Sequence, residues 1–109
     1  MTAPGVVVVL VARVPAGGRA SFLEYEAAVV PLLAEHRARL ERRLRSEDGR
    51  VEVHVVWFPS PVALAAYRAD PRRAAARPLL DASGAAVEAI ELADAPVEEL
   101  LGGRPRGEP

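Results

Sequence analysis

The chain has 109 residues, 50% of them hydrophobic and 27% charged, which is the composition of one globular domain with a single core. Its formal net charge of -1 provides no overall field that would draw it to nucleic acid or to an anionic membrane, so we expect neither as a partner. Cysteine, lysine, asparagine and glutamine are absent, which excludes disulfides, thiolate chemistry, Schiff bases and side-chain amide oxyanion donors.

The first predicted element is a strand over residues 5–14. Its sequence, GVVVVLVARV, is apolar on both alternating faces, a pattern typical of a central strand that is covered on both sides. The apolar run is shorter than the roughly 20 residues that span a bilayer, and no basic residue precedes it. We therefore expect a cytoplasmic protein whose first strand is buried.

A helix is predicted to follow this strand. Ser21 and Glu24 form a capping-box pattern, which predicts that the helix begins near Ser21. Apolar residues then recur with helical spacing at Phe22, Tyr25, Val29 and Leu33. We expect the helix to bend at Pro31, which has no backbone N–H to donate, and to continue to about His36.

Residues 39–58 are predicted to form a β-hairpin. Propensity alone would extend the helix through HRARLERRLRS, but Asp48-Gly49 is a strong hairpin signal and a Val-rich strand follows it. We expect residues 39–46 to pair with residues 51–58 through a two-residue turn, because a three-residue turn with a bulge would mix the two faces. The predicted pairs are Leu44 with Val53, Arg42 with Val55 and Leu40 with Trp57. The opposite face then carries Arg39, Glu41, Arg43, Arg45, Glu52, His54, Val56 and Phe58.

Two N-terminal helix signals follow the hairpin. Ser60 and Asp70 are good N-cap residues, and each precedes a proline at the first helical position. We expect a helix that is broken once between these signals and that ends at Gly84.

The chain is predicted to finish with a strand over residues 85–92 and a tail. We expect a dimeric α/β-barrel domain over residues 1–93 and a C-terminal tail over residues 94–109. One helical turn is expected around residues 97–101, and the Gly, Pro and charge content past Gly102 predicts disorder.

The order of elements predicts the fold class. The order βαββαβ is the ferredoxin-like, split βαβ arrangement of α+β proteins. It predicts an antiparallel sheet of order 4-1-3-2 with both helices on one side, because the crossovers are right-handed. The other side is left bare and carries more apolar surface than a soluble monomer usually tolerates. We therefore expect a homodimer whose sheets pack face to face.

The strand EVHVVWFPSP and the helix ALAAYRADPRRAA carry a resemblance to a known family. The signature residues are Phe58-Pro59-Ser60, Tyr67 and Asp70-Pro71. Over residues 6–92 the chain resembles a family of small dimeric α/β-barrel proteins of unknown function, related to antibiotic-biosynthesis monooxygenases. The resemblance implies the ferredoxin-like fold and a dimer. The chain departs from the family pattern at Trp57, where a glutamate is common, and at Arg37, where a glycine is common.

His54 is the candidate catalytic residue, because it is a titratable group in an otherwise apolar strand. The predicted register places Glu52 beside it and Arg43 opposite it, so a carboxylate could orient the imidazole as a general base. The alternative is a structural histidine at the dimer interface, because the predicted register points His54 away from the helices. His36 is expected to cap the first helix through the helix dipole.

Five residues are candidates for ligand binding: Tyr25, Arg43, His54, Trp57 and Tyr67. The three aromatic side chains could line a pocket for an apolar or aromatic ligand, although their spacing is also typical of core residues. The arginines of the hairpin and of the later helix could hold a carboxylate or phosphate, or could be solvated; the helical ones are Arg72, Arg73 and Arg77. Only Glu52 and His54 approach a metal-ligand spacing, so we expect no metal and no cofactor.

Two functions from different classes remain open. One is a non-catalytic dimer that binds a small apolar or aromatic ligand or serves as an accessory protein. The other is a cofactor-independent enzyme, monooxygenase- or isomerase-like, that acts on a small aromatic or polyketide-like substrate with His54 as base. A closed, polar-ended pocket within each subunit would favour the enzyme, and a filled interior would argue against it.

Overall fold

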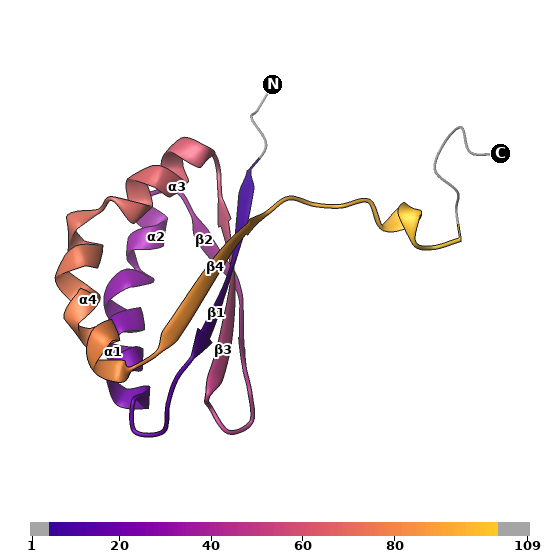
Figure 1. Cartoon of the computed structure of the whole chain (residues 1–109). Coiled ribbons are helices and arrows are strands. Elements are labelled where there is room, and N and C mark those ends of the chain that lie inside the picture. The colour runs from indigo at the N-terminus through magenta and orange to yellow at the C-terminus, as the bar shows by residue number, and fades with distance from the viewer. Residues whose placement is uncertain (1–4, 103–109) are drawn as a thin grey trace.

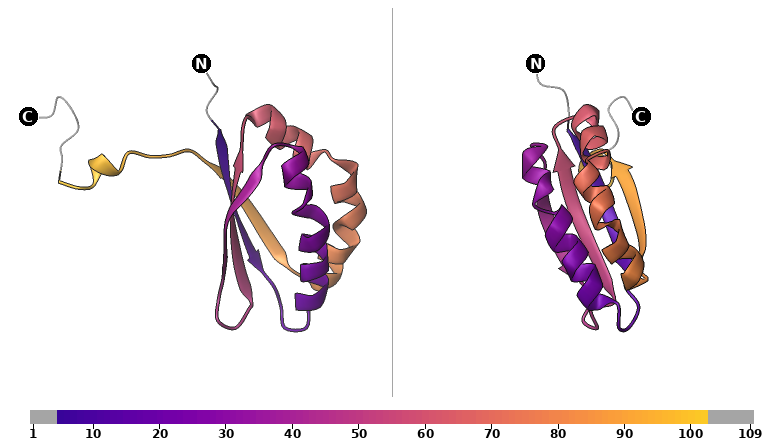
Figure 2. Two further views of the ribbon diagram at one scale, coloured as in Figure 1. Left: turned by 180° about the vertical axis from the view of Figure 1, so that it is seen from behind. Right: turned by 90° about the vertical axis from the view of Figure 1, so that its left-hand side faces the viewer.

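The structure is a computed structural model that describes residues 5–102. Its elements are β1 (Val6–Arg13), α1 (Arg19–Val29), α2 (Leu32–Glu35), β2 (Arg39–Arg45), β3 (Val51–Phe58), α3 (Pro61–Arg68), α4 (Pro71–Ser83), β4 (Ala86–Leu92) and a 3-10 turn (Val97–Glu99). The strands form one antiparallel sheet of order β2-β3-β1-β4, and the helices lie together on one side of it (Figures 1 and 2). The predicted ferredoxin-like fold and sheet order are confirmed.

β2 and β3 form the predicted hairpin. The predicted register holds for Leu44 with Val53 and for Arg42 with Val55. A β-bulge at Glu41 then shifts the pairing by one residue. Leu40 therefore lies opposite Val56, and the predicted pair with Trp57 is wrong. The bulge turns Leu40 toward the core and places Arg39 opposite Trp57.

The hairpin loop is longer than the predicted two-residue turn. The backbone N–H of Ser46 donates to the carbonyl of Val51 at 2.9 Å, and residues 47–50 form the loop between them. Gly49 has φ of 73°, a left-handed conformation in which a side chain is strained. Its carbonyl accepts a hydrogen bond from Nη1 of Arg19 at 3.2 Å, which ties the loop to the start of α1.

The face that carries His54 is the face that the helices cover. The even-numbered residues of β3, which are Glu52, His54, Val56 and Phe58, are all buried. The prediction that His54 points away from the helices is therefore wrong. Alternation shows which residues share a face, but it cannot show which face the helices cover.

The first helix differs from its prediction at both ends. α1 begins at Arg19 with Gly18 as N-cap, and no side chain caps it, so the predicted capping box at Ser21 does not form. α1 ends at Val29, and a separate short helix, α2, follows Pro31. The predicted bend is a break, because proline cannot donate the hydrogen bond that would continue the helix.

The turn after α2 places Arg37 in an unusual backbone conformation. Arg37 has φ of 61°, the left-handed conformation for which glycine is the usual residue. Backbone hydrogen bonds from Arg37 to Ala34 at 3.1 Å and from Ala38 to Leu33 at 2.9 Å close this turn. The arginine therefore occupies a glycine-like position.

α3 and α4 begin as predicted. Oγ of Ser60 accepts from the backbone N–H of Ala63 at 3.1 Å, and Oδ1 of Asp70 accepts from that of Arg72 at 3.0 Å. α4 ends at Gly84, whose φ is 70°. The last strand begins at Ala86.

The core fills the space between the helices and the sheet in two clusters. One joins α1 and α4 to β1 and consists of Ala12, Val14, Phe22, Tyr25, Val29, Ala76 and Leu80. The other joins α2 and α3 to β1 and β3 and consists of Val8, Leu33, Ala38, Val56, Phe58 and Leu64. The candidate site described below lies where the two clusters meet.

The opposite face of the sheet is largely apolar, and no helix of the described chain covers it (Figure 2). Strand pairing places on this face the apolar residues Val7, Val9, Val11, Leu44, Val53, Val55, Trp57, Ile90 and Leu92, together with the charged residues Arg13, Arg39, Arg42 and Glu88. Leu44 is 42% exposed and Leu92 47% exposed, which is high for large apolar side chains.

Beyond β4 the chain runs away from the sheet (Figure 1). The predicted helical turn is present as the 3-10 turn Val97–Glu99. Val97 and Leu100 are largely exposed. The disorder predicted past Gly102 lies outside the described residues. In the part of the chain that the structure describes, no helix has the length and apolar content needed to cross a membrane.

Candidate functional site

A pocket lies between the helices and the sheet, within a single subunit. It measures about 90 Å³, and because a single water needs about 10–15 Å³, it has room for several waters or one aromatic ring. Its apolar lining consists of Val8, Leu10, Val29, Val30, Leu33, Val56, Phe58, Leu64 and Ala89. Its polar lining consists of Tyr25, Glu26, His54, Tyr67, Arg68 and Arg73. The pocket is therefore mostly apolar, with a small set of polar groups from α1, β3, α3 and α4.

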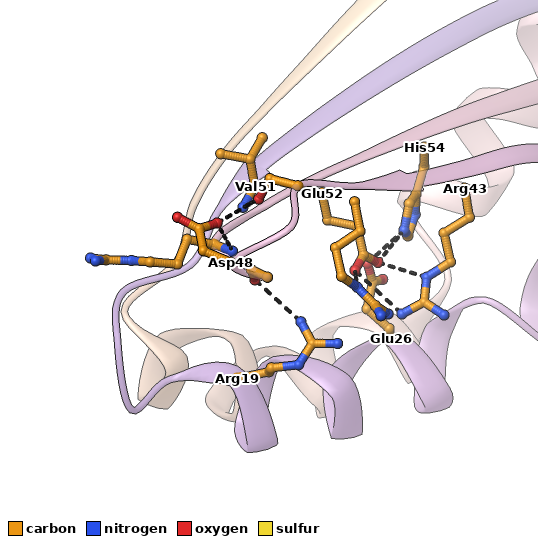
Figure 3. A network of polar contacts seen from close by, with 11 residues as sticks. Arg19, Glu26, Arg43, Asp48, Val51, Glu52 and His54 are labelled. Atoms are coloured by element: carbon orange, nitrogen blue, oxygen red, sulfur yellow. Dashed lines mark hydrogen bonds and ion pairs between the residues drawn. The ribbon is translucent and has the colours of Figure 1, made fainter.

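His54 and Glu52 form the centre of a buried polar cluster on β3. Nε2 of His54 lies 2.7 Å from Oε2 of Glu52, and the side chains are 5% and 1% exposed (Figure 3). The two residues are neighbours on one face of the strand, so the backbone itself holds them at this distance. The predicted pairing of Glu52 with His54 is thus present, but beneath α1.

Two arginines of β2 hold the Glu52 carboxylate from the other side. Arg43 donates to it through Nε at 2.8 Å and through Nη2 at 3.3 Å, and Nε of Arg45 donates at 3.2 Å. Burial alone raises the pKa of Glu52, but the hydrogen bonds from Arg43, His54 and Arg45 outweigh burial and lower the pKa to about 2. Glu52 is therefore a carboxylate at neutral pH.

This charge state decides which nitrogen of His54 carries the proton. A carboxylate can only accept hydrogen bonds, so Nε2 of His54 must donate to Glu52. Nε2 is then occupied and cannot take a proton from a ligand. Glu52 and its two arginines therefore orient the imidazole and fix its tautomer.

Glu26 of α1 completes the cluster (Figure 3). Its Oε1 lies 3.4 Å from Nε2 of His54, and this buried oxygen has no hydrogen-bond partner among residues 5–102. Burial raises the pKa of Glu26, and this effect outweighs the charges of Arg43 and Arg73, which lower it. A carboxyl group with a raised pKa and a free oxygen at a pocket wall is suited to accept and return a proton.

The sequence predictions did not include Glu26. A signal was present, because Glu26 completes the i, i+3, i+4, i+7 spacing of Phe22, Tyr25 and Val29. All four of these residues are buried in α1. An acidic residue on an apolar stripe of a helix must be paired or must have a raised pKa, and either makes it a candidate for chemistry.

The pocket has a second polar wall, formed by Tyr25, Tyr67 and Arg73. The guanidinium of Arg73 lies over the ring of Tyr67, 4.6 Å from its centroid, and Nη2 of Arg73 is 3.4 Å from the hydroxyl of Tyr25. The hydroxyl of Tyr67 donates to the carbonyl of Val29 at 3.4 Å. Burial raises the pKa of Tyr67, so its hydroxyl stays protonated at neutral pH.

The structure brings three of the five predicted ligand-binding residues to this pocket: Tyr25, His54 and Tyr67. Arg43 lies behind His54, where it holds Glu52 and lines a separate, open hollow between α1 and β2. Glu26 and His54 line that hollow too, so they stand between the pocket and the outside. Trp57 lies on the bare face of the sheet, with the guanidinium of Arg39 4.2 Å from its ring centroid.

Glu26, Glu52 and His54 are also placed where they could meet a metal ion. One ligand atom from each lies within 4.8 Å of the others, and carboxylate and imidazole groups are ligands for Zn²⁺. Both oxygens of Glu52, however, already accept hydrogen bonds from arginine. Because these cations repel a metal ion, the arrangement fits an ion-paired cluster better than a metal site.

His36, the other histidine, has a structural environment. Its Nε2 lies 2.9 Å from Oδ2 of Asp70, the N-cap residue of α4. Its ring meets the ring of Tyr67 edge-on, with centroids 5.8 Å apart. His36 follows α2 as its C-cap residue and connects the end of that helix to the start of α4.

Comparisons with known proteins identify the fold. No protein-family model and no curated protein matches the sequence. Among solved structures, Rv0793 from Mycobacterium tuberculosis matches with a TM-score of 0.71 and 19% identity, over 85% of this chain and 97% of that one. SnoaB, a cofactor-independent oxygenase from Streptomyces nogalater, matches with a TM-score of 0.70 and 20% identity, over 86% and 96%. A candidate antibiotic biosynthesis monooxygenase from Nitrosomonas europaea matches with a TM-score of 0.70 and 14% identity, over 91% and 93%.

Sequence identities this low establish the shared fold alone. At the level of the fold, the structural matches support the predicted relation to the antibiotic-biosynthesis monooxygenases, because proteins of this kind are among the neighbours. The neighbours' activities are not transferred by this similarity, since one fold hosts many functions.

Proposed function

We propose that the protein binds a small, mostly apolar molecule in the pocket between its helices and its sheet. The observation that carries the proposal is an apolar hollow within one subunit at which polar groups from four elements converge. Ligand sites are typically concave and apolar, with few polar groups to fix orientation. The size of the pocket favours a ligand with one aromatic ring or an aliphatic group of similar volume.

A second candidate function is an acid–base enzyme that acts on such a molecule. The specific observation in its favour is Glu26, whose unpartnered Oε1 lies at the pocket wall and whose pKa is raised by burial. Glu26 and His54 are both candidate bases, because Oε1 of Glu26 has no partner among residues 5–102 and the Nε2–H of His54 donates to Glu52, which leaves Nδ1 as an acceptor. SnoaB, which shares the fold, is a cofactor-independent oxygenase, so this fold hosts such enzymes. A substrate whose C–H or O–H group is acidified by an adjacent carbonyl or aromatic ring would suit this site.

The functional unit in this proposal is a homodimer with the two bare sheet faces packed together. The support is the apolar face of the sheet, on which Leu44, Ile90 and Leu92 are 37–47% exposed. A large, mostly apolar face of this kind is typical of a protein–protein interface. The pockets lie on the opposite, helix-covered face, so dimerisation would leave them accessible.

Ligand binding can be tested by a thermal-shift screen of small aromatic and aliphatic compounds, because a ligand that binds only the folded state must raise the melting temperature. The matched variants are Ala89→Phe and Ala75→Phe. Ala89 is an exposed residue that lines the pocket, whereas Ala75 is an exposed residue of α4 outside it. We expect stabilising compounds to lose their effect on Ala89→Phe and to keep it on Ala75→Phe. Stabilisation that survives in both variants would place the ligand elsewhere and contradict the proposal.

A further inference from the structure

Arg73 of α4 is a partly buried cation without a counterion. Its Nε is buried and has no hydrogen-bond partner among residues 5–102. Its Nη2 has one weak contact, 3.4 Å to the hydroxyl of Tyr25. In the described chain no carboxylate lies within ion-pair distance of its guanidinium. Leaving a donor of a charged group buried and unsatisfied is unfavourable, so this site is incomplete without a further group.

The neighbouring arginines show the contrast. Arg68 pairs with Glu91 at 3.0 Å, and Arg77 pairs with Asp81 at 3.0 Å. Arg72 pairs with Asp70 at 2.8 Å. The side chains of Arg68, Arg72 and Arg77 are exposed. Arg73 is half-buried, and its guanidinium lies against the ring of Tyr67 at the pocket wall. Of these four arginines, Arg73 alone has no counterion among the described residues. It lines the pocket, and its Nε is shielded from water.

One edge of the Arg73 guanidinium, with an unpartnered Nε and a weakly bonded Nη2, has the geometry that a carboxylate prefers. Nε and Nη2 lie on the same edge of a guanidinium and donate in parallel to the two oxygens of one carboxylate. The hydroxyl of Tyr25 is next to Nη2 and could donate a third hydrogen bond. The ring of Tyr67 packs against the guanidinium and limits its rotation.

Glu26 does not fill this role within the protein. Its carboxyl group lies beside His54, and it makes no ion pair with Arg73 within 4.0 Å. The pocket lining therefore offers an acid–base group at Glu26, a cation at Arg73 and a set of apolar side chains. A ligand that matches this lining has an anionic group and a compact apolar body.

We propose that the ligand is a small aromatic or aliphatic carboxylate, whose anionic group is held by Nε and Nη2 of Arg73 with help from Tyr25. This inference rests on the proposed ligand-binding function and names its substrate class. The apolar part of the ligand then lies against Val29, Val56 and Leu64. In the enzymatic version of the proposal, Arg73 is a positioning residue.

The experiment compares phenylacetate with its neutral isostere phenylacetamide, by ligand-observed NMR titration of the full chain at pH 7.5. Because hydrogen bonds to charged groups are the stronger ones, we expect phenylacetate to bind about tenfold more tightly or better. In Arg73→Gln the two affinities should agree within about twofold, since the charge that separates them is gone. Arg77→Gln, at an exposed position one turn further along α4, is the matched control and should keep the preference.

The possible failures are distinguishable. Equal affinities in the unmodified protein, or a preference that survives in Arg73→Gln, would overturn the inference and leave the pocket proposal intact. Absence of binding by either probe would contradict the proposed function itself. Arg73→Lys, which keeps the charge but loses the two-pronged geometry, provides a second variant if Arg73→Gln does not fold, and it should show a preference reduced several-fold.

Discussion

Nε2 of His54 lies 2.7 Å from Oε2 of Glu52, and both side chains are buried on the face of the sheet that the helices cover. This relationship determines much of the chemistry of the pocket. It fixes the imidazole tautomer with Nδ1 as the acceptor nitrogen, and the nearby Oε1 of Glu26 has no partner among residues 5–102.

Replacing Glu52 by Gln should destabilise the fold at neutral pH by about 2 kcal/mol or more, because charged hydrogen bonds from three partners are weakened in a buried place. The folded-state pKa is about 2, below the ordinary value of 4.5. The stabilising contribution is therefore fully present above pH 4.5 and is lost as the pH falls toward 2. Urea unfolding at several pH values measures this loss.

The control for this prediction is Glu41→Gln. Glu41 forms an exposed pair with Arg39 at 3.3 Å, and such pairs are worth roughly 0–1 kcal/mol. A Glu52→Gln variant that is as stable as Glu41→Gln at pH 7, or a difference that grows on acidification, would show that the cluster does not stabilise the fold in this way.

Replacing Glu26 by Gln should change the folding stability in the opposite direction to Glu52→Gln. Burial raises the pKa of Glu26, so the folded state loses stability as the pH rises and this group ionises. The variant should be at least as stable as the unmodified protein at pH 7–8, and the difference should vanish as the pH falls toward 4.5. Unfolding midpoints in urea across this range provide the measurement, with Glu24→Gln, an exposed position on α1, as control. If Glu26→Gln is less stable than the unmodified protein, by a difference that grows with pH, then the Glu26 carboxylate stabilises the fold.

Replacing Gly49 by Val should destabilise the hairpin by about 1 kcal/mol or more, because a β-branched residue resists positive φ. A side chain at this position would also meet Nη1 of Arg19, which lies 3.1 Å from where its Cβ would be. Gly49→Asn should lose less, since asparagine tolerates the left-handed conformation. Chemical unfolding of both variants distinguishes the outcomes, and equal stability of Gly49→Val and the unmodified chain would count against the described loop.

Replacing Val55 by Arg should convert the proposed dimer to a monomer, because it adds a second cation directly opposite Arg42 in the middle of the bare sheet face. The matched control is Val62→Arg on α3, where the valine is 78% exposed and lies outside that face. Light scattering at micromolar concentration should give a dimer for the unmodified chain and for Val62→Arg. A monomer for the unmodified chain would refute the face-to-face assembly, whose interface should exceed roughly 1,200 Å².

Much of the fold could be predicted from local patterns. The Asp48-Gly49 signal gave the hairpin, and the cap-then-proline signals at Ser60 and Asp70 gave the starts of α3 and α4. The bulge at Glu41 could not be predicted, because no residue pattern in β2 indicates it. The bulge turns Leu40 toward the core, and this contact depends on distant segments of the chain. The capping box at Ser21 misled because helix α1 starts earlier, at Arg19.

The candidate site was predicted less well, and the reason is the face assignment on β3. One face of this strand is entirely apolar, with Val53 and Val55 at its centre, and the other carries Glu52 and His54. Judged by apolar content alone, the face with Val53 and Val55 would be assigned to the core. The polar face is the one beneath the helices because Arg43 and Glu26 reach it from other elements, and no local pattern reports contacts between distant segments.

The central claim is that the pocket between the helices and the sheet binds a small carboxylate, and amide chemical-shift mapping tests it most directly. Phenylacetate added to ¹⁵N-labelled protein should produce saturable shifts at pocket residues such as Val29, Val56 and Leu64. Amides of Leu44 and Val62, on the bare face and on the outside of α3, should stay unchanged. Shifts confined to the bare sheet face, or no shifts at millimolar phenylacetate, would contradict the account.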